Sequence, residues 1–126
     1  MTDLQCIEID SISNVSVVKL KDEKLMAPAQ VETLGDELLS LVEGERAQDE
    51  ANVLINFENV RFFSSGAINK LIVLEKRVRA RGGQIRLSNM RPEVRDLFSY
   101  TNLDSMFDIR GNQAEAILAF EQTPDE

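Results

Sequence analysis

Two adjacent serines, Ser64 and Ser65, are followed by Gly66 and are the side chains in this sequence best placed to do chemistry. They stand where an apolar segment ends and an amphipathic helix is predicted to begin. A serine nucleophile needs a general base, and the sequence contains no histidine, so a Ser-His-Asp arrangement is impossible. A small enzyme that pairs Ser64 or Ser65 with a lysine such as Lys70 is the weakest functional hypothesis. We expect no catalytic residue.

The sequence also lacks the residues and motifs that metal and cofactor sites usually need. A single cysteine and no histidine disfavour a structural zinc site. Neither a Gly-x-Gly-x-x-Gly nor a Gly-Lys-Ser motif accompanies Gly66, which is instead expected to let the helix start pack closely. We therefore expect no cofactor and no metal, and we expect Cys6 to be buried in the first strand.

The serines also have a structural interpretation. A serine that precedes a helix accepts a hydrogen bond from a free backbone N–H, which is worth about 1 kcal/mol relative to alanine. This capping role is compatible with a functional one, because a helix start is exposed and can present its hydroxyl to another protein. The residue types alone leave the two roles open for Ser64.

Length and charge limit the possible functions. The chain has 126 residues, the size of one domain, and a net charge of −8. Because phosphate backbones repel such a chain and its basic residues are scattered, nucleic-acid binding is disfavoured. No apolar run approaches the ~18 residues of a membrane span, and the N-terminus lacks the pattern of a signal peptide. We expect a cytoplasmic protein with no membrane span.

Hydrophobic periodicity divides the chain into alternating strands and helices. The apolar run 53–57 is typical of a strand that is covered on both faces. The predicted strands are 4–10, 15–20, 53–57, 84–88 and 106–109. The predicted helices begin at Pro28, at Ser64 or Ser65, at Pro92 and at Gln113, and Gly44 and Gly82-Gly83 stand near the ends of the first two.

The resulting order, β-β-α-β-α-β-α-β-α, predicts a small single α/β domain that spans residues 1–126. The polar turn 11–14 suggests an N-terminal antiparallel hairpin. After it strands and helices alternate, which predicts parallel strands with right-handed crossovers. We thus expect a central mixed β-sheet, mostly parallel, with about four helices, a core over 4–121 and a frayed tail at 122–126.

At this point the sequence resembles a known family, the STAS domain of sulfate transporters and anti-sigma factor antagonists. The matching landmark is Val53-Leu54-Ile55-Asn56-Phe57-Glu58-Asn59-Val60-Arg61-Phe62-Phe63-Ser64-Ser65-Gly66-Ala67, which resembles the family's third strand, its exit loop and the Ser-Ser-Gly opening of its second helix. Gly82-Gly83 and the apolar segment 94–98 before Leu103 add to the likeness. The resemblance covers roughly residues 4–121.

The resemblance implies a function and a site. Free-standing members act as antagonists of anti-sigma factors, and an anti-sigma factor that is itself a serine kinase phosphorylates the first serine of the pair. In this chain that residue is Ser64, although members with the clearest switch often carry Asp where Phe63 stands. The residues expected to bind the partner are Phe63, Ser64, Ser65, Gly66, Asn69 and Lys70.

Some assignments stay open. Phe62 and Phe63 either fill the core beneath the loop, or Phe63 is partly exposed beside Ser64 and belongs to an apolar contact patch. Met26 and Pro28 lie in a loop that is a candidate to share the side of Ser64. The leading function is an anti-sigma factor antagonist that captures a kinase-type anti-sigma factor and is released by phosphorylation at Ser64. The alternative is a STAS subunit of another assembly, such as a sensory complex or a transport system.

Overall fold

The computed structural model describes residues 4–43 and 52–122, without the side chain of Gln122. Its main sheet has five strands in the order β1-β2-β4-β6-β7. The first two, β1 (Ile7–Ile12) and β2 (Val15–Leu20), are antiparallel and pair from Ile7 with Leu20 to Ile12 with Val15. The expected hairpin is therefore confirmed, but only Ser13 and Asn14 form its turn. Both have positive φ, at 52° and 65°, as the tight primed turns of hairpins require.

The other strands run parallel to β2. They are β4 (Asn52–Asn56), β6 (Ile85–Ser88) and β7 (Asp108–Arg110), and each pairs in parallel register with its neighbour in the sheet. β-Branched and leucine side chains dominate β2 and β4, which suits strands in the middle of a sheet. The predicted mixed sheet, parallel except for its first hairpin, is confirmed.

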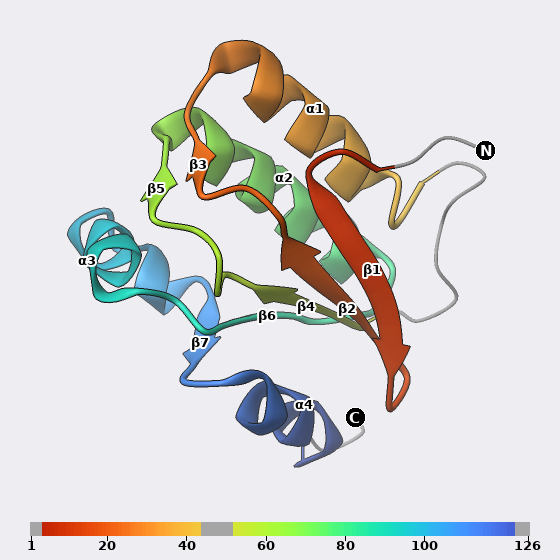
Figure 1. Ribbon diagram of the computed structural model, residues 1–126. Helices are drawn as coiled ribbons and strands as arrows, with labels where there is room; N and C mark the ends of the chain where they lie inside the picture. Colours follow the sequence, from red (N-terminus) through yellow and green to blue (C-terminus); the bar gives the residue numbers. More distant parts are fainter. Residues whose placement is uncertain (1–3, 44–51, 123–126) are drawn as a thin grey trace.

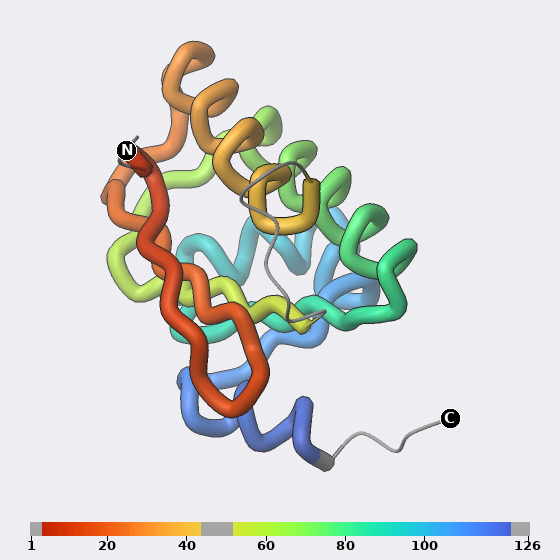
Figure 2. Tube along the Cα trace, turned by 90° about the vertical axis from the view of Figure 1, so that its right-hand side faces the viewer, coloured from red at the N-terminus to blue at the C-terminus, as the bar shows by residue number. Residues whose placement is uncertain are grey.

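Four α-helices occur in the described part of the chain, as expected. They are α1 (Pro28–Leu39), α2 (Ser65–Ala80), α3 (Pro92–Tyr100) and α4 (Gln113–Gln122), with a short 3-10 helix η1 (Leu103–Ser105) after α3. Figures 1 and 2 show α1 and α2 side by side over one face of the sheet, while α4 covers the opposite face. No helix in residues 4–43 and 52–122 is long and apolar enough to cross a membrane.

Two apolar cores result from this layering. The larger one lies between the sheet and the α1–α2 pair, and its most deeply buried members include Leu20, Leu34, Leu38, Ile55, Leu71 and Leu74. The smaller one lies between the sheet and α4 and contains Val15, Val17, Leu54, Ala116 and Phe120. On α4, Ala116 and Phe120 are buried in this smaller core, whereas Leu118 is exposed.

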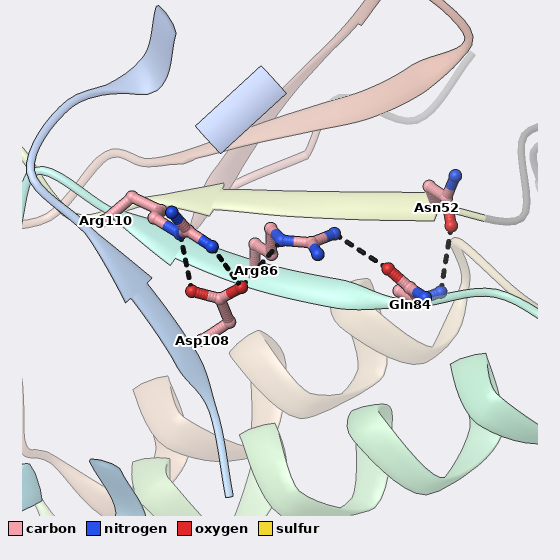
Figure 3. A network of polar contacts seen from close by, with 5 residues as sticks. All are labelled: Asn52, Gln84, Arg86, Asp108 and Arg110. Atoms are coloured by element: carbon pink, nitrogen blue, oxygen red, sulfur yellow. Dashed lines mark hydrogen bonds and ion pairs between the residues drawn. The ribbon is translucent and has the colours of Figure 1, made fainter. Parts of the chain in front are cut away.

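A polar network that is centred on the buried Arg86 lies at the edge of the small core (Figure 3). Arg86 of β6 lies 4.4 Å from the ring centre of Phe120, and its Nε donates to Asp108 (2.9 Å) while its Nη1 donates to Gln84 (2.8 Å). Arg110 also donates to Asp108, at 2.7 and 3.0 Å. The hydrogen bond from Arg110 is the main reason why the pKa of Asp108 lies below its ordinary value. The network joins β6 to the edge strand β7.

Several boundaries differ from the sequence-based expectation. β1 begins at Ile7 rather than at residue 4, so Cys6 is buried just ahead of the strand and not within it. β7 begins at Asp108 because Met106 belongs to the turn that follows η1. Gly82 has φ +84° and terminates α2 as predicted. The predicted helix stop at Gly44 lies outside the described residues, and so does the predicted tail 122–126 apart from Gln122, which is the last residue of α4.

Candidate functional site

Ser64 is the N-cap residue of α2. Its backbone is extended, with φ −80° and ψ 164°, and its Oγ accepts a hydrogen bond from the N–H of Ala67 (3.1 Å). Its carbonyl accepts from the N–H of Ile68 (3.0 Å). The residue is half-buried rather than sealed in the core. The capping interpretation is confirmed.

A second, two-stranded sheet fixes the position of Ser64. Its strands are β3 (Lys24–Leu25) and β5 (Phe62–Phe63), which run parallel with Lys24 opposite Phe62 and Leu25 opposite Phe63. The ladder continues one residue further, because the N–H of Ser64 donates to the carbonyl of Leu25 (3.0 Å). The loop before α1 therefore lies beside the loop before α2, as Figure 1 shows. The expected proximity of Met26 to Ser64 is confirmed.

Strand alternation decides which side chains of this small sheet face outward. Leu25 is fully buried and Phe63 is 5% exposed, whereas Met26 is 52% exposed and Phe62 is 48% exposed. Successive side chains of a strand point to opposite faces. We use the name outward face for the four residues on the solvent side of the ladder, which are Lys24, Met26, Phe62 and Ser64.

The structure corrects the idea that Phe63 is exposed beside Ser64. The Phe63 ring packs edge-on against Phe57 (ring centres 5.3 Å apart) and is stacked on Phe98 (6.4 Å). The loop core beneath Ser64 is built from these rings, which leaves no part of Phe63 for a large contact with another protein. The exposed aromatic residue beside Ser64 is Phe62.

The remaining predicted site residues lie on the first turns of α2. Ser65, Gly66 and Asn69 are exposed. A Cβ atom on Gly66 would lie 3.5 Å from Val31 Cγ1 and 3.6 Å from Ser64 Oγ, which are ordinary contact distances. Close packing therefore does not require a glycine at this position, contrary to our expectation.

Lys70 lies further along the helix and joins α2 to α1. Its Nζ is 3.1 Å from the Glu32 carboxylate, and its stem lies so close to Gly35 that a Cβ there would be 2.6 Å from Lys70 Cδ. Because Glu32 binds the ammonium group, Lys70 is not available as a base for Ser64, which weakens the serine–lysine enzyme hypothesis further. Its role in this structure is a contact between helices.

The charges around Ser64 are mostly paired. Arg61 Nε lies 3.1 Å from Glu23, and the Lys70–Glu32 pair has the same separation. Lys24 differs, because its ammonium lies 5.5 Å from the ring centre of Phe62 and, among the described residues, no carboxylate lies within ion-pair distance of it. Sequence reasoning missed Lys24, and no local signal could have revealed it, since its place depends on pairing with a strand far along the chain.

A separate hollow of about 230 Å³ lies at the other end of α2 and is lined by charged side chains that include Glu75, Arg79 and Asp108. These groups already bind one another or their neighbours, since Arg79 pairs with Glu75 and Asp108 binds Arg86. In the described ranges, no group of histidine, cysteine, aspartate and glutamate residues is arranged to hold a metal ion. The polar groups of this hollow thus support the fold.

Comparison with known proteins assigns the family. The STAS domain profile matches residues 7–116, so the chain belongs to the STAS domain family. No curated protein sequence matches it. Among solved structures, an anti-sigma-factor antagonist (STAS) domain protein from Planctomyces limnophilus is 24% identical with a TM-score of 0.78, and the match covers 90% of this chain and 96% of that one.

Two further structures show how widely this fold is used. The Bacillus cell fate determinant SpoIIAA in its phosphorylated form is 19% identical, with a TM-score of 0.65 and coverage of 90% and 97%. A sulfate transporter family protein from Wolinella succinogenes is 9% identical, with a TM-score of 0.70 and coverage of 89% and 88%. The fold is therefore shared by anti-sigma factor antagonists and by transporter-associated proteins.

Proposed function

We propose that this chain is an anti-sigma factor antagonist that captures a kinase-type anti-sigma factor and is released when Ser64 is phosphorylated. The observation that carries the proposal is the place of Ser64 on an exposed face. Its hydroxyl lies at the start of α2, next to the exposed side chains of Phe62 and Met26. Exposed apolar side chains around a hydroxyl favour the docking of a protein partner, because the docked partner buries these side chains and covers the hydroxyl.

The helix start allows a phosphate on Ser64 without disturbing the fold. A phosphate adds a charge of about −1.5 to −2 at neutral pH. It would meet the free N–H groups and the positive dipole end of α2, whose first turn holds no acidic residue. A partner docked over the same place would meet extra bulk and charge. Phosphorylation thus changes binding and leaves the domain intact.

Two of the structurally similar proteins support a signalling role. The protein from Planctomyces limnophilus is described as an anti-sigma-factor antagonist, and SpoIIAA has been solved in a phosphorylated form. An antagonist of this kind acts in the cytoplasm as a binding protein, with no catalytic activity of its own. Ser65, Gly66 and Asn69 complete the contact surface at the start of α2, together with the outward face.

The test is phosphorylation in vitro. The chain is incubated with ATP and each anti-sigma factor serine kinase of the same organism, and the phosphate is located by mass spectrometry. We expect one phosphate, on Ser64, and none in Ser64→Ala, while Ser65→Ala is modified like the wild type. Modification of another residue, or of none by every kinase, would remove Ser64 as the switch.

A second candidate is a STAS subunit of a transport assembly, which the likeness to the Wolinella succinogenes protein favours. In that case the chain would co-purify with a permease or an ATPase rather than with a kinase. Purification of the tagged, unmodified chain from its own cells, followed by identification of the bound protein, separates the two functions.

A further inference from the structure

We propose that Lys24 reads the state of Ser64: its ammonium group binds an acidic side chain of the partner when Ser64 is free, and binds the phosphate when Ser64 is modified. This inference rests on the proposed function. It specifies that the partner supplies a carboxylate, and that the phosphate on Ser64 competes with this carboxylate for the ammonium group of Lys24.

The first step is the geometry of the outward face. Lys24 is opposite Phe62 in the parallel ladder, and Ser64 follows Phe62 by two residues in extended conformation. Residues two apart on a strand project from the same face with a spacing of about 6.6 Å. A phosphate on Ser64 therefore lies within reach of the flexible four-carbon stem of Lys24.

The second step is the charge of this face. The neighbouring cations are already neutralised, since Arg61 pairs with Glu23 and Lys70 pairs with Glu32. Within residues 4–43 and 52–122, Lys24 Nζ has an aromatic ring as its close partner but no carboxylate. An open positive charge in a chain of net charge −8 is a point of attraction for an anion. The partner group that complements it is a carboxylate.

The third step is the position of the ammonium over Phe62. The ring centre lies 5.5 Å from Nζ, a distance at which a cation is attracted to the ring face. This contact holds the lysine beside two exposed apolar side chains, Phe62 and Met26. A partner that covers them would exclude water from the ammonium group and strengthen its pairing with a carboxylate. A phosphate on Ser64 competes for the same ammonium group from within the chain.

The experiment uses the full chain with phosphoserine inserted at position 64 during synthesis, so it needs neither kinase nor partner. A ³¹P NMR titration gives the second pKa of the phosphate, which is about 6 for a free phosphoserine. A nearby ammonium favours the doubly charged phosphate and lowers this pKa. We expect Lys24→Gln to raise it by about 0.5 relative to the unsubstituted chain, from the Coulomb energy of a solvated pair at about 5 Å.

Two controls make the result specific. Lys24→Arg should restore most of the lowering, because it keeps the charge. Lys76→Gln removes another exposed lysine, about 18 Å along α2, and should leave the pKa of the phosphate unchanged. Equal pKa values in the Lys24→Gln and unsubstituted chains would overturn the intramolecular contact, even if Ser64 proves to be the kinase target.

The partner contact has its own measurement. With the kinase that modifies Ser64 as the probe, unphosphorylated Lys24→Gln should bind about 2- to 5-fold more weakly than the wild type, and the difference should shrink as salt rises. Unchanged binding would overturn the carboxylate contact. If no kinase modifies Ser64, the proposed function fails, while the ³¹P titration still decides whether Lys24 binds a phosphate at this position.

Discussion

Replacement of Ser64 by alanine removes the hydrogen bond that its Oγ accepts from the N–H of Ala67 (3.1 Å). The N–H then lies at the start of a 16-residue helix without its cap. The loss of such a cap costs about 1 kcal/mol, which lowers the melting temperature of a domain of this size by about 4 °C. Thermal unfolding followed by circular dichroism measures the change.

Aspartate at the same position separates stability from binding. Its carboxylate also caps a helix and interacts favourably with the positive end of the helix dipole, so Ser64→Asp should be at least as stable as Ser64→Ala and close to the wild type. Ser65→Ala is the matched control, because Ser65 is exposed at the first helical position and should change stability by less than about 0.5 kcal/mol. A stable Ser64→Ala beside a destabilised Ser65→Ala would refute the assignment of the cap.

Three further predictions concern residues around the site and in the two cores. Phe63→Ala should cost about 3–5 kcal/mol because it empties the aromatic cluster, whereas Phe62→Ala should cost less than about 1 kcal/mol; equal losses in urea unfolding would contradict the assignment of Phe63 to the core. Burial raises the pKa of the Cys6 thiol to about 11, so Cys6 should react slowly with a thiol reagent at pH 8. The contribution of the neutral thiol to the free energy of unfolding should decline as the pH rises towards 11. Rapid labelling of the native chain at pH 8 would argue against this burial. Because the pKa of Asp108 is lowered in the folded chain, its contribution to the free energy of unfolding is complete above the pKa of an unfolded carboxyl and is lost as the pH falls through the folded value. Asp108→Asn should therefore make the free energy of unfolding less dependent on pH in the acid range. An unchanged pH dependence would count against the network with Arg86.

Local pattern was sufficient for the main sheet and its helices. The spacing of apolar residues identifies long elements such as α2 and the face that they bury, and a capping residue or a glycine marks their ends, as Ser64 and Gly82 do. The candidate hydroxyl could be found in the same way, because a strand exit followed by Ser-Ser at a helix start is visible in the sequence. These features depend on neighbours within a few residues of each other.

The outward face could not be predicted because its geometry depends on distant residues. β3 and β5 have two residues each, too few to show a period, and they become strands only by pairing with each other. Without that register, nothing in the sequence tells which of Phe62 and Phe63 points outward. Arg86 shows the same limit, since its alternating strand suggests a solvent-facing arginine until Phe120 of α4 covers it.

Calorimetric titration of the anti-sigma factor kinase with the unmodified chain and with the chain phosphorylated at Ser64 tests the proposed switch most directly. We predict that the phosphorylated chain binds at least about tenfold more weakly, a difference of about 1.4 kcal/mol, while its unfolding transition stays close to that of the unmodified chain. Equal affinities for the two forms, or a weaker affinity explained by loss of the folded state, would contradict the account.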